Sequence, residues 1–345
     1  AYGKAEWLLH SAGSALDTIV PPISGRDTLV LDGLTISGGP VRVPNPFGTS
    51  QRRCDAGAVQ MLAGSLEIID SVIEPGSDDA SRTGIVVVDS DVTMTGTSVS
   101  GYASGLFVER RMHGSDHFVT LEDVTLTGGP GDGIGVDIND YNGGSFTNVA
   151  IDSYNDGGMF LGGGAWVMTG GSLTSNDSGI GLFDGGLDID GTLFDDNFNQ
   201  AIFAVSGGQP GLQVTVRNAT FSQNAGELGG AIHYENDGVN GSLVIEDSSF
   251  SDNFAFVGGS IWARGRIELD GVTATGSADR DASRGGFLYL EGEGSIANSD
   301  LSTFDAREGG IITHAGATLM GEFDFPMDQY LTISDTQLSE MVRYW

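Results

Sequence analysis

The 345-residue chain has one cysteine, few prolines and no long hydrophobic run, and each shortage excludes a class of protein. Cys54 alone cannot form an internal disulfide, and it excludes metal sites built from several cysteines. The chain has nine prolines against 55 glycines and no Gly-X-Y period, which excludes a collagen triple helix. No apolar stretch is long enough to span a bilayer as a helix. We therefore expect a turn-rich protein without membrane insertion.

Basic residues are also scarce. The 15 basic residues face 47 acidic ones, which gives a net charge of -32, and Lys4 is the only lysine. Such a chain repels nucleic acids and anionic membrane surfaces, so neither is an expected partner. Of the acids, 33 are aspartates. An aspartate-rich surface suits salt-rich water, which screens charges within a few Å, but aspartate is also favoured in turns, and both explanations stay open.

Two similar phrases follow each other in the second half of the chain. Residues 212–224 read LQVTVRNATFSQN and are followed by GGAI at 229–232. Residues 241–253 read GSLVIEDSSFSDN and are followed by GGSI at 258–261. Two copies so close together indicate a repeat architecture, in which each repeat buries its apolar face against its neighbours.

The repeat extends to most of the chain as three aligned columns, spaced mostly 21 to 29 residues apart. The middle column holds only Gly, Asn or Asp, the residues that tolerate a left-handed backbone: Gly33, Asp70, Gly96, Asp123, Asn148, Gly170, Gly191, Asn218, Asp247, Gly271, Asn298 and Asp335. An apolar column lies two residues before it, from Leu31 to Ile333, and another three residues after it, from Ile36 to Leu338. Both apolar columns are predicted to point inward.

This pattern predicts an all-β fold: a single-stranded right-handed parallel β-helix, or solenoid, of about twelve coils with caps at both ends. Residues 1–24 do not fit the repeat. They show short helical spacing before Pro21 and Pro22, so they are expected to cap the solenoid. We expect the coils over residues 25–316, and the last coil with a C-terminal cap over 317–345, since an uncapped end would be a sheet edge open to polymerisation.

Short motifs within the coils resemble those of known families. Phe-x-x-Asn occurs at Phe194, Phe221 and Phe250, and Gly-Gly-Ala/Ser-Ile follows the last two. The chain resembles the right-handed parallel β-helix family, and the paired motifs, over roughly residues 190–262, resemble the polymorphic outer-membrane-protein repeats of bacterial surface proteins. The latter resemblance implies exported surface structures and adhesion, and it implies no enzyme.

The third strand of each coil is predicted to carry rings on its outward side. If Ile85, Leu106 and their eight equivalents point inward, the residue that follows each of them points outward. Six of these ten outward residues bear rings, namely Phe107, Phe160, Phe203, His233, Trp262 and Tyr289. An outward apolar stripe usually marks an interface. Three explanations stay open: burial under a terminal segment, a protein or self-association surface, and a platform for stacking sugars. A register error of one residue would turn the rings inward.

The most polar loop, residues 109–117, is predicted to lie beside the loop of the next coil at 137–142. Acids, histidines and arginines would meet there as a possible acid/base cluster for a carboxylated sugar: Arg110, Arg111, His113, Asp116, His117, Asp137 and Asp140. The alternative is a solvated loop whose arginines neutralise neighbouring acids.

Catalysis is not expected. Many β-helix relatives are polysaccharide lyases or hydrolases, which need paired carboxylates, or calcium-binding acids with a basic residue. Here the acids are scattered over loops, and no catalytic residue is predicted. No cofactor is expected apart from a possible structural calcium ion, for which Asp78–Asp79, Asp195–Asn197 and Asn236–Asp237 offer oxygen ligands.

The sequence therefore predicts a non-enzymatic, extracellular β-helix module of a prokaryotic surface or matrix protein. It would act in adhesion or self-assembly, including end-to-end or lateral formation of filaments or layers. Its partner would be another copy, another surface protein or a carbohydrate. The alternative is a carbohydrate-binding or polysaccharide-degrading β-helix, a class that includes tailspike-like proteins.

Overall fold

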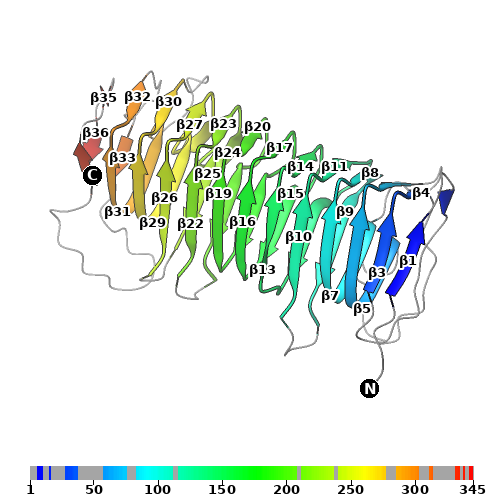
Figure 1. Cartoon of the computed structure of the whole chain (residues 1–345). Helices are drawn as coiled ribbons and strands as arrows, with labels where there is room; N and C mark the ends of the chain where they lie inside the picture. Colours follow the sequence, from blue (N-terminus) through cyan, green and yellow to red (C-terminus); the bar gives the residue numbers. More distant parts are fainter. Residues whose placement is uncertain are drawn as a thin grey trace. The chain divides into compact units, whose positions relative to one another are not determined.

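A computed structural model describes residues 6–10, 15–16, 28–37, 57–75, 83–111, 116–207, 211–236, 240–276, 285–302, 311–313, 331–334, 337–338 and 342–344. The regular structure of these residues consists of β-strands (Figure 1). Among them, no helix is long and apolar enough to cross a membrane. The chain divides into two compact units, Ala1–Trp166 (unit 1) and Val167–Trp345 (unit 2).

In unit 1, successive coils contribute strands to three parallel rows, and each strand pairs with its equivalent in the next coil. The first row contains β1 (Glu6–His10), β3 (Thr28–Asp32), β5 (Gly57–Ile69), β7 (Thr83–Thr95), β10 (Phe118–Glu122) and β13 (Gly143–Thr147). The second row contains β2 (Ala15–Leu16), β4 (Thr35–Ser37), β6 (Val72–Glu74), β8 (Ser98–Tyr102), β11 (Thr125–Gly128) and β14 (Ala150–Asp152). The third row begins in β5 and β7 and continues as β9 (Ser104–Glu109), β12 (Ile134–Asn139) and β15 (Gly157–Gly162).

Unit 2 has the same three rows, and the strand β16 (Ala165–Thr169) contains the division between the units. Its first row contains β19 (Gly186–Asp190), β22 (Gln213–Arg217), β26 (Ser242–Glu246), β29 (Ile261–Asp270), β31 (Leu288–Ala297) and β34 (Leu331–Ser334). Its second row contains β17 (Ser172–Thr174), β20 (Leu193–Asp195), β23 (Thr220–Ser222), β27 (Ser249–Ser251), β30 (Thr273–Thr275), β32 (Asp300–Ser302) and β35 (Gln337–Leu338). Its third row contains β18 (Ile180–Phe183), β21 (Ile202–Val205), β25 (Ile232–Glu235), the first halves of β29 and β31, β33 (Ile311–Thr313) and β36 (Val342–Tyr344).

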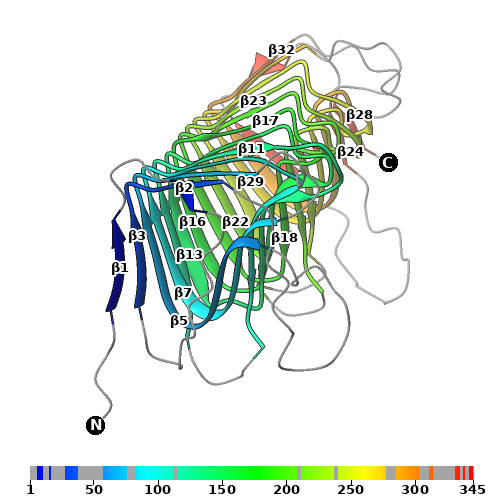
Figure 2. The ribbon, with the colours of Figure 1, turned by 90° about the vertical axis from the view of Figure 1, so that its right-hand side faces the viewer.

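Unit 2 also has a separate two-stranded parallel sheet, which we call sheet C. It consists of β24 (Ala225–Leu228) and β28 (Phe254–Val257). Figure 2 shows β23 and β24 on successive sides of the coils, so sheet C fills the corner between the second and third rows.

The predicted columns agree with the strand register inside each unit. In unit 1, for example, Leu121 pairs with Phe146 in the first row and Leu126 with Ile151 in the second. The turn column has positive φ at all eleven positions that the structure describes, for example 53° at Asp123. A bend of this kind at the same point of every coil explains why only Gly, Asn and Asp occur there.

The two units place different side chains at the end of each second-row strand and at the corner that follows it. In unit 2, the rings of Phe194 and Phe221 stack at 4.9 Å, and those of Phe221 and Phe250 at 4.7 Å. Three residues further on, buried asparagines form a ladder: Asn197 Nδ2 donates to Asn224 Oδ1 at 2.8 Å. Asn224 Nδ2 donates in turn to the next asparagine, Asn253, at 2.9 Å. Aromatic stacking and satisfied buried amides therefore run along the same side of unit 2.

In unit 1, buried tyrosines occupy the corresponding place. Tyr102 and Tyr154 are each 1 % exposed. A Cβ atom on Gly84 would lie 3.1 Å from the Tyr102 ring, and one on Gly135 would lie 3.1 Å from the Tyr154 ring. Each tyrosine therefore packs against a third-row position that has no side chain. Burial raises the pKa of Tyr154 well above its ordinary value, so its phenol stays protonated.

The prediction for the N-terminal segment is partly wrong. Residues 6–10 and 15–16 are strands that pair with β3 and β4, whereas the sequence suggested short helical spacing. Among the described residues the second row has six strands in unit 1 and seven in unit 2, so the coil count differs slightly from the expected twelve. The cap boundaries at residues 24 and 317 remain predictions.

Candidate functional site

The ring-bearing residues predicted on the third row do align, and we call those of unit 2 the aromatic row. Phe203 pairs with His233, His233 with Trp262, and Trp262 with Tyr289. The His233 ring lies 4.9 Å from the Phe203 ring and 4.5 Å from the Trp262 ring. The register that placed these residues on one face is therefore correct across unit 2 up to Tyr289.

Two details of that register are wrong. In unit 1, Asp137 rather than Gly135 pairs with Phe107 and with Phe160. The register is offset by two residues, and Gly135, near the start of β12, instead lies against the Tyr154 ring. In unit 2, Ile312 rather than Thr313 pairs with Tyr289.

The aromatic row is also less exposed than the sequence predicted. His233, Trp262 and Tyr289 are only 7, 5 and 8 % exposed. Leu228 of β24 and Val257 of β28 pack against Trp262 and Tyr289. Among the described residues, the cover therefore comes from sheet C rather than from a terminal segment. Phe107, Phe160 and Phe203 are half-buried.

Burial changes the chemistry of His233. Desolvation lowers its pKa to about 4, with the charge of Arg264 acting in the same direction and a hydrogen bond to the backbone of Leu228 opposing it. Its Nε2 atom lies 3.8 Å from Glu235 Oε2. At neutral pH His233 is therefore an uncharged member of the aromatic row.

Charged residues form ion pairs beside the aromatic row. Arg264 NH1 donates to Glu235 Oε1 at 2.5 Å, and its Nε donates to Glu291 Oε2 at 3.0 Å. The Arg264 guanidinium also lies 5.3 Å from the centre of the Trp262 ring. One arginine thus links carboxylates of two neighbouring coils and adds a cation-π contact.

The first row of unit 2 repeats this arrangement. Arg217 NH1 donates to Asp188 Oδ1 at 2.6 Å, and its Nε donates to Glu246 Oε2 at 2.9 Å. The hydrogen bond to Glu246, with the charge of Asp188 in support, raises the pKa of Arg217. These carboxylates therefore serve as partners of one cation, which is not the arrangement of a poised acid and base.

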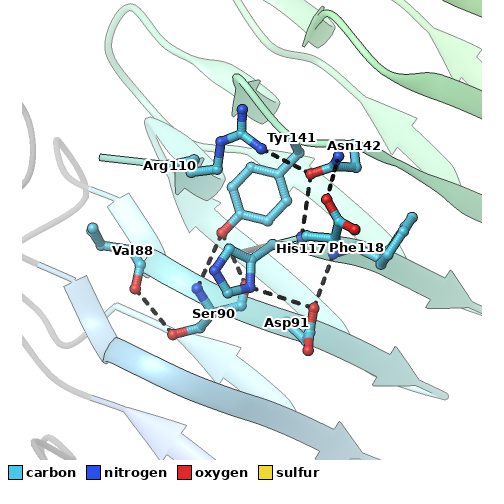
Figure 3. Close-up of polar contacts among 9 residues, drawn as sticks. Val88, Ser90, Asp91, Arg110, His117, Phe118, Tyr141 and Asn142 are labelled. Carbon is cyan, nitrogen blue, oxygen red and sulfur yellow. Dashed lines mark hydrogen bonds and ion pairs between the residues drawn. The ribbon is translucent and has the colours of Figure 1, made fainter. Parts of the chain in front are cut away.

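In unit 1, a polar network gathers between β7, β10 and the turn after β12 (Figure 3). The Tyr141 hydroxyl donates to the Ser90 carbonyl oxygen at 2.9 Å, and the His117 and Tyr141 rings are 5.8 Å apart. His117 Nδ1 lies 3.6 Å from Asp91 Oδ1. Burial raises the pKa of Tyr141 well above its ordinary value, so its phenol is a donor and not a base.

Asn142 connects this network to the predicted polar loop. Its Oδ1 accepts hydrogen bonds from Arg110 NH1 at 2.9 Å and from the His117 backbone N–H at 3.4 Å. Its Nδ2 donates to Asp116 Oδ1 at 2.9 Å. Arg110, Asp116 and His117 therefore do come together, through an asparagine that the sequence prediction left out. The only sequence signal for Asn142 was its position in the loop at 137–142, which was predicted to lie beside residues 109–117.

The other predicted members of the cluster have different environments. Arg111 Nε donates to Glu109 Oε2 at 2.6 Å, and its backbone N–H donates to the buried Asp89 at 2.7 Å. Asp137 lies on the third row, where its Oδ1 accepts from Asn139 Nδ2 at 2.8 Å. Asp140 is an exposed turn residue with φ 61°. His113 lies outside the described residues.

Metal ligands do not cluster in the part of the chain that the structure describes, where no group of three His, Cys, Asp or Glu side chains could hold an ion. Of the predicted calcium ligands, Asp195 accepts a hydrogen bond from the Ser222 hydroxyl, and Asn197 belongs to the buried ladder. Asp78, Asp79 and Asp237 lie outside the described residues. Structural calcium therefore remains a prediction.

The sequence prediction missed the exposed phenylalanines at the sheet C corner. Phe198 is 66 % exposed and Phe256 is 53 % exposed. The ring of Phe254, which is half-buried, lies 5.7 Å from that of Phe256. Phe198 and Phe254 each follow an asparagine of the Phe-x-x-Asn motif, so the alignment of those motifs was the signal that could have revealed them.

Comparison with known proteins identifies the family. A family model for a right-handed β-helix region matches residues 83–276, more than half of the chain. The chain belongs to the right-handed β-helix family. The family assignment also gives the handedness of the coils and agrees with the predicted fold. The curated proteins searched contain no match to the chain. The family includes both adhesive and polysaccharide-degrading members.

Proposed function

We propose that this β-helix acts as a non-enzymatic binding module, in adhesion or in self-assembly at a cell surface. The observation that carries the proposal is the exposure of Phe198 and Phe256 on the outside of otherwise well-packed coils. Large aromatic side chains bury much surface on binding and are enriched at interfaces. The net charge of -32 keeps such a molecule soluble outside its complexes and fits an exposed location.

The ion pairs on the first and third rows of unit 2 support the same proposal. A glycosidase or lyase needs carboxylates held apart, with one available to donate or accept a proton. In unit 2, Arg264 and Arg217 each bridge two carboxylates at 2.5 to 3.0 Å. Neighbouring side chains that neutralise each other in this way stabilise the stacking of coils.

A carbohydrate-binding function is the second candidate, and one observation in unit 1 favours it. Phe118 is 51 % exposed, and its backbone N–H donates to Asp91 Oδ1 at 3.0 Å. Figure 3 shows its ring directed away from His117 and Tyr141. An exposed ring beside Asp91, Asp116 and Asn142 offers both a stacking surface and hydrogen-bond partners, as a sugar ring requires.

A bead assay tests the proposal. Beads coated with the protein are mixed with each other and with surfaces carrying neutral or acidic polysaccharides or proteins. The chain length of each polysaccharide is followed by light scattering. We expect the beads to cluster or attach while the polymer lengths stay constant. Time-dependent shortening of a polymer would overturn the proposal, and so would the absence of both clustering and attachment. Attachment to polysaccharide alone, lost in Phe118→Ser, would favour the second candidate.

A further inference from the structure

Sheet C has an inner side that is packed and an outer side that is not. On the inner side, Leu228 and Val257 pack against the aromatic row, and Ala255 is fully buried. On the outer side, the rings of Phe254 and Phe256 meet at 72° with Phe256 more than half exposed. The phenylalanines therefore do not complete the core of unit 2.

Phe198 belongs to the same surface. The backbone N–H of Phe198 donates to the Asn176 carbonyl oxygen at 3.0 Å, and that of Phe254 donates to the Asn224 carbonyl oxygen at 2.8 Å. The N–H of Ala225 makes the same bond to Asn197 in the coil between them. Phe198 and Phe254 thus occupy equivalent places two coils apart, about 10 Å at the usual spacing of paired strands. We call Phe198, Phe254 and Phe256 the sheet C patch.

Among the described residues around the patch, the charged side chains have one sign. Asp196, Glu227 and Asp252 are exposed. Asp196 and Asp252 each lie two residues before a patch phenylalanine, and the register of sheet C places Glu227 of β24 opposite Phe256 of β28. The coil segments 193–201, 220–231 and 249–260 contain no Lys, Arg or His. Arg217, Arg264 and Arg266 instead form ion pairs with carboxylates of the first and third rows. The patch is therefore an aromatic surface with an acidic rim.

We propose that the sheet C patch binds an extended, basic segment of a partner protein, with Lys or Arg side chains beside an aromatic or aliphatic one. This inference rests on the proposed function and specifies its partner. Charge complementarity selects the occupant: the rim attracts cations, and aromatic faces bind Lys and Arg through cation-π contacts. The same rim repels acidic polysaccharides and a second copy, which carries a charge of -32.

The dimensions favour a peptide over a small cation. An extended strand rises about 3.3 Å per residue, so three or four residues span the distance of about 10 Å from Phe198 to Phe254. Alternate side chains of a strand point to the same face. A segment with Arg or Lys, an apolar residue and a second Arg or Lys at three successive alternate positions would therefore reach the acids of successive coils while the apolar residue contacts the rings.

Fluorescence anisotropy with a defined probe tests this inference. The probe is a labelled synthetic heptapeptide, Thr-Arg-Thr-Phe-Thr-Arg-Thr, whose Arg and Phe side chains share one face of an extended strand, and the control peptide has Glu in place of each Arg. We expect the Arg peptide to bind the wild-type chain and the Glu peptide not to bind. Phe198→Ser combined with Phe256→Ser should weaken binding at least tenfold, and Glu227→Gln with Asp252→Asn should weaken it several-fold. Val167→Ser, which removes an exposed apolar side chain from β16, is the matched control and should leave binding unchanged.

Thermal unfolding of each variant shows whether the fold is retained, and the substituted side chains are exposed. Equal binding of the Arg peptide to the wild type and the phenylalanine variants would overturn the inference, because only net charge would then matter. Self-association of the wild type that Phe256→Ser abolishes in sedimentation velocity would also overturn it in favour of a second copy. The bead assay separates this inference from the proposed function. Bead attachment that persists without peptide binding would refute the basic partner but would still support the binding function.

Discussion

The two units close the same corner of their coils with different chemistry. Unit 1 places tyrosines there, and each ring packs over a glycine of the third row, as Tyr154 does over Gly135. Unit 2 places asparagines there, and these hydrogen-bond to one another and to backbone carbonyls, as Asn224 does. A ring fills its space within one coil and its neighbour, whereas the asparagine ladder links four successive coils, from Asn176 to Asn253, by side-chain hydrogen bonds. The difference predicts that unit 2 depends more on single polar side chains than unit 1 does.

The largest expected effect is at the centre of the ladder. Asn224→Ala removes the bond to the Phe194 carbonyl at 3.0 Å and the bonds to Asn197 and Asn253. Buried partners left unsatisfied cost about 1 to 3 kcal/mol each, so we expect a loss of roughly 3 to 5 kcal/mol in the free energy of unfolding. Urea unfolding measures it. Asn155→Ala, at an exposed asparagine of unit 1, is the control and should cost less than about 1 kcal/mol. Equal losses would remove the proposed difference between the units.

Acid should weaken the aromatic row of unit 2 next. The unfolded chain protonates His233 near pH 6.5, but the folded chain does so only near pH 4. Between these values the unfolded state binds more protons, so stability is lost as the pH falls from about 6.5 to about 4. The loss is at most about 3 kcal/mol at 1.36 kcal/mol per pH unit.

Urea unfolding at about pH 7 and about pH 4.5 measures this loss in the wild type and in His233→Phe. The groups facing His233 are Glu235, Arg264 and the Leu228 backbone, and they are the same in both proteins. The variant should lose less stability than the wild type over this range. Identical pH dependence would show that His233 does not contribute.

A smaller effect is expected where a tyrosine of unit 1 needs a glycine beside it. In Gly135→Ala, the added Cβ would lie 2.6 Å from the Gly158 carbonyl oxygen and 2.6 Å from Ile151 Cγ2. Overpacking of this kind costs about 1 to 3 kcal/mol. In the control, Gly186→Ala, the nearest atom would be 3.7 Å away, so thermal unfolding should show little change. A shift of the unfolding temperature as small as the control's would contradict this packing account.

The smallest loss of stability is expected at the ion pairs of the first row. Arg217→Gln removes ion pairs with Asp188 and Glu246 whose side chains are 41 to 50 % exposed, and such pairs are worth about 0.2 to 1 kcal/mol each. The loss should shrink in high salt, which screens the remaining acids. Unfolding at low and high salt measures it, and a loss that is large and independent of salt would mean that Arg217 has another role.

Much of this fold could be predicted from the sequence because each coil repeats the same local rule. Residues such as Asp123 and Asn148 must adopt positive φ, and the apolar positions on either side must face the core, so the register follows from the alignment. The register failed at Gly135 and Thr313, where the number of residues between rows changes and no local rule fixes it.

The candidate sites were harder to predict because they depend on what covers a surface. The sequence predicted Trp262 on an outward face, but it could not show that Leu228 and Val257 of a third sheet would pack against it. In the same way, the meeting of Arg110 and Asp116 through Asn142 follows from the exact turn between coils. Side-chain contacts of this kind are set by packing between coils and not by the pattern within one.

The most direct test of the binding account is an amide hydrogen-exchange footprint of the wild-type protein with and without the Arg heptapeptide. We predict slower exchange confined to residues 198–200 and the strands β24 and β28, with the amides around Phe118 unchanged. Protection around Phe118 instead, or no difference anywhere at a saturating peptide concentration, would contradict the assignment of binding to the sheet C patch.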